Sequence, residues 1–210
     1  MNFFIRLKNR ILTGIYVAFI KLGFRLKVIY EDPAMKDAPV QGIYICNHMT
    51  HLDGLLIRAI FNHMNMYSLV TSDWFDKGWA RSLLFYEKCI PINRDDPGTE
   101  WIHQARAVFK EGGSISIFPE GHTSKCETMN EFRPGFLMLA SFLKDIQIIP
   151  VATTGKYYFL FGPRKKVLVG RPIAFDRSKF SIDPEKMAQY ADEFRTVVEQ
   201  MQEKLRNGEV

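Results

Sequence analysis

The sequence predicts an α/β fold in which helices flank a central mixed sheet. Short apolar runs of strand length alternate along the chain with longer segments of helical periodicity, as this class requires. Some of these runs end abruptly in polar residues, which is typical of strands that reach the rim of a sheet. A length of 210 residues allows one domain with a full core and an appendage.

The strands and helices are expected in the following order. The strands are the apolar runs at 41–46, 66–71, 89–92, 114–118, 147–153 and 166–169. The helices are the segments near 3–28, 53–63, 74–86, 98–111, 134–143 and 184–206. Asp96-Pro97 and Asp183-Pro184 each predict a helix start, with a capping carboxylate before a proline at the first helical position. In the last helix an apolar stripe predicts core packing: Met187, Tyr190, Phe194, Val197, Val198, Met201 and Leu205.

The first 30 residues hold the whole basic excess of the chain. The formal net charge is +5, and residues 1–30 contain six basic residues and no acidic one. Aromatic and aliphatic side chains are interleaved with these charges, a composition that suits a helix or helix pair in an anionic lipid interface. We therefore expect residues 1–30 to form a basic amphipathic membrane-interface segment and residues 31–210 to form the α/β domain.

Other interpretations of residues 1–30 compete with this one. Its longest uncharged apolar stretch, 11–20, has ten residues, whereas a transmembrane helix needs about 20. Lys21 and Arg25 stand where a signal peptide would have a small-residue cleavage site. Nucleic-acid binding lacks an accompanying motif. A helix that packs only on the domain's own core stays open as an alternative.

Candidate catalytic residues follow the first expected strand of the domain. His48 comes directly after the run 41–46, and Asp53 stands five positions later. On one ideal helix these two side chains would point about 140° apart. We therefore expect His48 in the turn and Asp53 in the first turn of the next helix. There the carboxylate can bind one ring nitrogen and leave the other free to act as a general base.

Less specific interpretations of the same residues compete with this one. A helix cap beside a surface histidine is the commoner cause of such spacing. A metal site at His48, His51 and Asp53 would have few ligands, and no companion motif surrounds the remaining histidines, so we expect neither a metal nor another cofactor. The chain has no GxSxG, P-loop or GxGxxG motif. The three cysteines, expected to be free reduced thiols, are Cys46, Cys89 and Cys126.

Two further strand ends carry polar side chains. The run 114–118 leads into Pro119-Glu120-Gly121, and the run 89–92 leads into Asn93-Arg94. Ligands of open α/β sheets bind at the carboxyl ends of strands. These residues could therefore line one crevice together with His48 and Asp53.

The order and spacing of these segments resemble the glycerolipid acyltransferase family, most closely its bacterial 1-acylglycerol-3-phosphate acyltransferases. Asn47-His48 through Asp53 matches the family's NHxxxxD block, and 90–94 is similar to the block that ends in arginine. The segment 118–121 matches FPEG, about 70 positions further on, and 149–151 matches the closing apolar-Pro-Val block. The likeness covers roughly residues 38–175, and the two first motifs together are specific.

The resemblance implies a mechanism and a location. His48 would remove the proton of an acceptor hydroxyl as it attacks an acyl-ACP or acyl-CoA thioester, and Asp53 would orient the imidazole. Backbone N–H groups near the start of the helix after His48 would stabilise the oxyanion. The acceptor would be 1-acylglycerol-3-phosphate at the cytoplasmic face of the cell membrane. The residues expected to bind substrate are Asn47, Thr50, Arg94, Glu120, Gly121 and Arg133.

One departure from the family pattern concerns the acceptor. Members usually continue FPEG with Thr-Arg-Ser, whereas this chain has His122-Thr123-Ser124. Lys125 or Arg133 could supply the missing cation, although a lysine does not reproduce the planar guanidinium fork. A different lysophospholipid, a lyso-aminolipid, or a non-catalytic lipid-binding role therefore stays open, as does hydrolysis or transacylation at the same residues.

Overall fold

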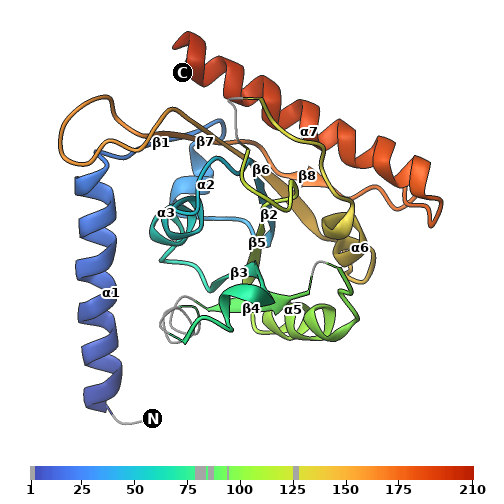
Figure 1. Cartoon of the computed structure of the whole chain (residues 1–210), viewed down its shortest axis with the longest axis horizontal. Coiled ribbons are helices and arrows are strands. Elements are labelled where there is room, and N and C mark those ends of the chain that lie inside the picture. The colour runs from blue at the N-terminus through green and yellow to red at the C-terminus, as the bar shows by residue number, and fades with distance from the viewer. Residues whose placement is uncertain (1–2, 79–83, 85–87, 94, 125–127) are drawn as a thin grey trace.

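The computed structural model describes residues 3–78, 84, 88–93, 95–124 and 128–210 (Figure 1). Within these ranges eight strands form one mixed sheet in the order β1-β7-β6-β2-β5-β3-β4, and β8 pairs with β6. Strand β6 is antiparallel to β7 and β8, and the other neighbours are parallel. The strands are β1 (Lys27–Tyr30), β2 (Gly42–Cys46), β3 (Met66–Thr71), β4 (Cys89–Ile92), β5 (Ser114–Ile117), β6 (Gln147–Thr154), β7 (Lys166–Val169) and β8 (Ile173–Ala174).

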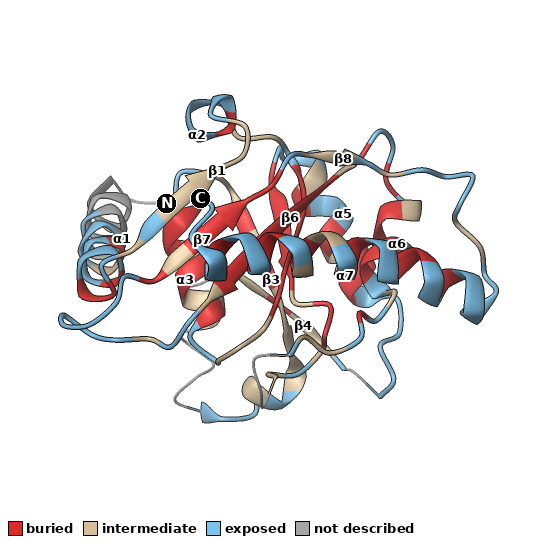
Figure 2. Cartoon of the chain, turned by 90° about the horizontal axis from the view of Figure 1, so that it is seen from above, coloured by how far each residue is buried: buried red, intermediate tan, exposed pale blue. Residues whose placement is uncertain are grey.

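Helices cover both faces of the sheet (Figures 1 and 2). Strand β2 shows why: Ile43 and Ile45 pack in the cluster with α5, α6 and α7, whereas Tyr44 and Cys46 pack in the cluster with α1 and α3. Alternate side chains of a strand face opposite sides, so a strand buried on both faces is apolar throughout. The helices are α1 (Phe3–Gly23), α2 (Ala34–Asp37), α3 (Asp53–Ile60), the 3-10 turn η1 (Ser72–Trp74), α5 (Glu100–Lys110), α6 (Gly135–Ser141) and α7 (Pro184–Asn207).

The six expected strands are confirmed, with bounds that differ by at most one residue. Two short strands were missed, β1 and β8. The expected helix 3–28 was too long, because α1 ends at Gly23 and Arg25 adopts a φ of +48°. Residues Lys27–Tyr30 then pair in parallel with β7 as strand β1. Pairing with a distant strand thus overrides the local helical pattern.

The two predicted helix starts had different outcomes. Asp183 caps α7 as expected, accepting hydrogen bonds from the amides of Glu185 and Lys186 ahead of the buried apolar stripe. The start at Asp96-Pro97 was wrong. Gly98 has a φ of +53°, which a right-handed helix cannot include, and α5 begins only at Glu100. Most of the expected helix 74–86 lies outside the described residues.

Helix α1 stands at the edge of the domain and packs along α3 (Figure 1). The Tyr16 hydroxyl donates a 2.8 Å hydrogen bond to the carbonyl of Leu55, and Val17 and Ile20 are buried in the shared core. No helix among the described residues has both the length and the apolar character needed to cross a membrane.

Candidate active site

His48 and Asp53 meet at the carboxyl end of β2. His48 lies in the turn after the strand, and Asp53 is the first residue of α3, as the spacing predicted. Nδ1 of His48 is 3.2 Å from Oδ2 of Asp53. The imidazole also stacks on the ring of Phe118, with the centroids 4.4 Å apart. These two contacts fix the ring, and Nε2 makes no hydrogen bond with the described residues, so it can accept a proton.

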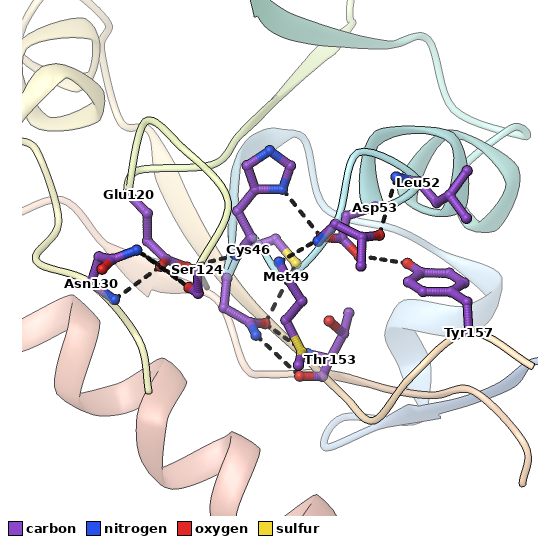
Figure 3. Close-up of polar contacts among 12 residues, drawn as sticks. Cys46, Met49, Leu52, Asp53, Glu120, Ser124, Asn130, Thr153 and Tyr157 are labelled. Carbon is purple, nitrogen blue, oxygen red and sulfur yellow. Dashed lines mark hydrogen bonds and ion pairs between the residues drawn. The ribbon is translucent and has the colours of Figure 1, made fainter. Parts of the chain in front are cut away.

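Asp53 is fully buried, and both of its carboxylate oxygens accept hydrogen bonds. The amides of Met49 and Thr50 each donate to Oδ2 across 2.7 Å. The Tyr157 hydroxyl donates to Oδ1 across 2.5 Å (Figure 3). The amides of Met49 and Thr50 in the turn after His48 therefore bind Asp53. Oxyanion binding by the N–H groups near the start of α3 stays a prediction.

The pKa of Asp53 lies below its ordinary value. Burial alone would raise this pKa, but hydrogen bonds from His48, from the Thr50 amide and from Tyr157 outweigh it. The positive charge of Lys165 lowers the pKa further. The carboxylate is therefore ionised at neutral pH and can stabilise a protonated imidazole.

Tyr157 and Lys165 support Asp53, and the sequence did not predict this role for either residue. Lys165 is buried, its Nζ donates a 2.9 Å bond to the carbonyl of Gly155, and it lies 4.1 Å from the centre of the Tyr157 ring. Burial lowers the pKa of Lys165, while the charge of Asp53 opposes that shift. Neither residue belongs to a sequence motif. Only their place in the loop after β6, the strand beside β2, could have indicated that they lie near Asp53.

Glu120 links the FPEG segment to the turn that holds His48. It is buried, and the amide of His48 donates a 2.6 Å hydrogen bond to Oε1. Its Oε2 accepts bonds from the Ser124 hydroxyl and from the amide and side chain of Asn130 (Figure 3). All these donors belong to the chain itself, so Glu120 holds His48 and the loop 119–130 in place.

Two other residues of the NHxxxxD block also make internal contacts. Asn47 is buried and exchanges hydrogen bonds with the backbone of Thr153 at the end of β6, at 3.1 and 2.8 Å. Thr50 accepts a 3.1 Å bond from the amide of Leu52 through its hydroxyl. These contacts tie the turn to the neighbouring strand and to the start of α3.

A largely apolar cavity of about 870 Å³ opens beside His48. It lies between α3, β3, β4, α5 and α6, and Phe118, Trp101, Phe136 and Met138 contribute to its walls. Its volume is in the range of small-molecule and cofactor sites. His48 therefore faces a space that suits an apolar ligand.

Gly121 and Arg133 form another part of the cavity wall. Gly121 has a φ of +74°, and a Cβ added there would lie 3.1 Å from Nε of Arg133. The glycine thus allows the exposed Arg133 guanidinium to lie against the backbone. Arg94, expected to bind the acceptor, lies outside the described residues.

A family model described as Acyltransferase matches residues 27–154, more than half of the chain. The chain belongs to the acyltransferase family. A 1-acyl-sn-glycerol-3-phosphate acyltransferase of Cocos nucifera is 29% identical over 144 residues, which are 67% of this chain and 45% of the relative. One of Bacillus subtilis is 24% identical over 62% of this chain and 66% of its own length. The acyltransferase chain thus spans less than two thirds of these curated relatives.

The fold of this chain is similar to that of a solved acyltransferase structure. The 1-acyl-sn-glycerophosphate acyltransferase PlsC of Thermotoga maritima matches with a TM-score of 0.65 at 19% identity, covering 94% of this chain and 81% of that one. The predicted fold class is therefore confirmed. In the described part of this acyltransferase, no group of three or more His, Cys, Asp or Glu side chains is arranged to hold a metal ion. Cys46 and Cys89 form no disulfide within the described residues, and Cys126 lies outside them.

Proposed function

We propose that this protein transfers a fatty acyl group from a thioester, acyl-ACP or acyl-CoA, to the free hydroxyl of 1-acylglycerol-3-phosphate in phospholipid biosynthesis. The observation that carries the proposal is the His48–Asp53 pair at the wall of an apolar cavity. The names of the curated relatives support the acceptor, since each is a 1-acyl-sn-glycerol-3-phosphate acyltransferase.

The reaction needs one general base and no covalent enzyme intermediate. Nε2 of His48 removes the proton of the acceptor hydroxyl as its oxygen attacks the thioester carbonyl carbon. The new C–O bond forms, the C–S bond breaks, and the proton passes from the imidazole to the leaving thiolate. The buried carboxylate of Asp53 stabilises the imidazolium that forms between these steps.

The cavity suits the acyl chains of the substrates. Its apolar walls would remove a fatty chain from water, with the reacting carbonyl placed beside His48. Arg133 and Arg94 are the proposed contacts of an acidic head group, and Gly121 gives Arg133 its place. Glu120, Asn47 and Thr50 would act by holding the catalytic turn.

A second acceptor is favoured by one observation. His122 and Thr123, which replace the usual Thr-Arg of the family, line the cavity close to His48. A lysophospholipid with another head group, or a lyso-aminolipid, would need fewer cations there. The same chemistry would then serve a different lipid.

We further propose that the protein acts at the cytoplasmic face of the cell membrane, bound through α1. The segment 1–30 has six basic residues and no acid, which suits an anionic lipid surface. The apolar acceptor would then reach the cavity from the bilayer, while the thioester donor arrives from solution.

The experiment measures thiol release and acyl transfer with acyl-ACP or acyl-CoA as donor and a panel of lyso-acceptors. The proposal predicts acyl transfer to lysophosphatidic acid at a rate above that for lysophosphatidylcholine or lyso-aminolipids. Faster transfer to one of the latter would establish the second acceptor. Thiol release without any acceptor, or no release with any of them, would contradict acyl transfer as the function.

A further inference from the structure

Four consecutive large side chains are exposed in the loop between β6 and β7. This segment, called the aromatic loop below, consists of Tyr158, Phe159, Leu160 and Phe161, and its last residue is 82% exposed. Soluble surfaces rarely gather apolar side chains in this way unless they bind a partner or a membrane. The proposed reaction does not use any of the four.

The aromatic loop is fixed to the end of α1. The amide of Leu160 donates a 2.6 Å bond to the carbonyl of Gly23, and Leu160 holds a φ of +62°, which leucine rarely adopts. The Phe159 ring contacts Phe19 and Phe24, with centroids 5.1 and 5.7 Å away. Figures 1 and 2 both show the loop beside this end of the helix. The two segments therefore form one surface.

Helix α1 extends this surface along its outer face. Large apolar residues are exposed at intervals of three or four positions: Ile11, Ile15, Phe19 and Leu22. A rotation of about 100° per residue places them on one side of the helix. Val17 and Ile20, on the opposite side, are buried in the core shared with α3. The exposed stripe is thus the side of α1 that does not pack on the domain.

The charged residues that flank these apolar side chains in the sequence are basic. The exposed basic residues next to the stripe and the loop are Lys21, Arg25, Lys27, Lys156 and Arg164. The sequence has no acidic residue before Glu31 and none between Asp145 and Asp176. Apolar and aromatic side chains flanked in the sequence by basic residues alone complement an anionic lipid surface.

We infer that the aromatic loop is a second membrane anchor, which enters an anionic bilayer together with the exposed stripe of α1. The inference deepens the proposed membrane association and rests on it. Two anchors in contact with each other also orient the domain on the bilayer. Tyr157, the residue before the aromatic loop, donates its hydroxyl to Asp53, so this hydrogen bond connects the start of the second anchor to the His48–Asp53 pair.

The test is co-sedimentation with vesicles of phosphatidylcholine alone and of phosphatidylcholine mixed with phosphatidylglycerol. The variant is Leu160→Ser/Phe161→Ser, whose two side chains are exposed, and the matched control is Ile182→Ser, at a side chain that is 95% exposed outside this surface. The inference predicts that the loop variant partitions at least about tenfold more weakly into the mixed vesicles, whereas the control matches wild type. Equal partitioning of the loop variant and wild type would overturn it.

Removing single positive charges tests the anionic bilayer as the partner independently of the apolar side chains. Lys156→Gln and Arg164→Gln are each expected to weaken binding to the mixed vesicles by about fivefold, an effect that disappears at high salt. Binding that ignores both charges would overturn the anionic bilayer as the occupant. A wild-type dimer that dissociates in the Leu160→Ser/Phe161→Ser variant, with vesicle binding unchanged, would also overturn the inference. The aromatic loop would then be buried between two copies of the chain.

Failure of the inference and failure of the proposed reaction can be told apart. The loop variant should keep wild-type acyl transfer to a short-chain, water-soluble lyso-acceptor, because its substitutions lie outside the cavity lining. Loop-dependent vesicle binding by a wild-type protein without transferase activity would refute the reaction alone. Full activity with loop-independent binding would refute the second anchor alone.

Discussion

The hydroxyl of Tyr157 lies 2.5 Å from Oδ1 of Asp53, although 104 positions separate the two residues in the chain. The other carboxylate oxygen faces His48. The carboxylate is thus held between the imidazole that it orients and a phenol from the loop after β6 (Figure 3). This relationship adds a third side chain to the proposed catalytic pair of His48 and Asp53.

Tyr157→Phe should lower kcat about tenfold and leave KM nearly unchanged. A hydrogen bond to a charged group contributes about 1.5–3 kcal/mol, and its loss loosens the carboxylate that orients His48. Steady-state kinetics measure the effect. Tyr30→Phe, which removes a hydroxyl from strand β1, is the control. A Tyr157→Phe enzyme with wild-type kcat would show that the phenol has no part in positioning Asp53.

Asp53→Asn should reduce activity by roughly two to four orders of magnitude, because a neutral amide neither stabilises the imidazolium nor accepts from all its present donors. The variant will also be less stable, since the single oxygen of the amide cannot accept from all the donors that the two carboxylate oxygens serve. Activity is therefore compared at a temperature at which circular dichroism shows both proteins folded. Retention of more than a few per cent of the wild-type rate would argue against the pair.

Stability should fall in acid through Asp53. Its pKa is lower in the folded protein than in the unfolded chain, where it is about 3.9, so ionisation favours folding. This contribution is complete above about pH 4 and disappears as the pH falls through the folded-state pKa. Urea unfolding of wild type and Asp53→Asn between about pH 6 and pH 3 should show free energies of unfolding that converge. A difference that does not depend on pH would contradict the low pKa.

Glu120→Ala should lower the free energy of unfolding by about 1–3 kcal/mol, because several buried donors lose their acceptor. Activity should fall as well, since the amide of His48 is one of these donors. Glu131→Ala, at an exposed residue of the same loop region, is the matched control. Equal melting temperatures for the two variants would exclude the proposed holding role of Glu120.

Gly121→Ala should raise KM for a charged acceptor more than it lowers kcat. The new Cβ would meet Nε of Arg133 at 3.1 Å and displace the guanidinium from the cavity wall. The positive φ adds a cost of about 1–2 kcal/mol in stability. Gly112→Ala has the same φ of +74° but no neighbour within 4 Å, so it isolates the backbone cost. If both variants keep the wild-type KM, Arg133 does not bind the acceptor.

Much of this arrangement was predictable from local sequence. Strands buried in the sheet consist of apolar residues, so the apolar runs predicted six of them. The spacing of His48 and Asp53 required a turn followed by a helix start. Strand β1 was missed because its neighbour in the sheet is β7, more than a hundred residues away, and no local pattern carries that pairing.

The residues that support Asp53 were missed for a similar reason. Tyr157 and Lys165 belong to no motif, and they reach the carboxylate only because β6 lies beside β2 in the sheet. Glu120 was predicted to lie near the pair, and it does. Its role as an internal acceptor could not be predicted, since the donors Ser124 and Asn130 come from a loop whose path the sequence does not specify.

The most direct test of the account is acyl transfer from a thioester to lysophosphatidic acid by wild type, His48→Ala and His103→Ala. His103 is an exposed histidine of α5, so its removal controls for the loss of an imidazole elsewhere. The account predicts transfer by wild type and His103→Ala, and a loss of at least about a hundredfold in His48→Ala. Transfer by His48→Ala at more than a few per cent of the wild-type rate would contradict His48 as the general base.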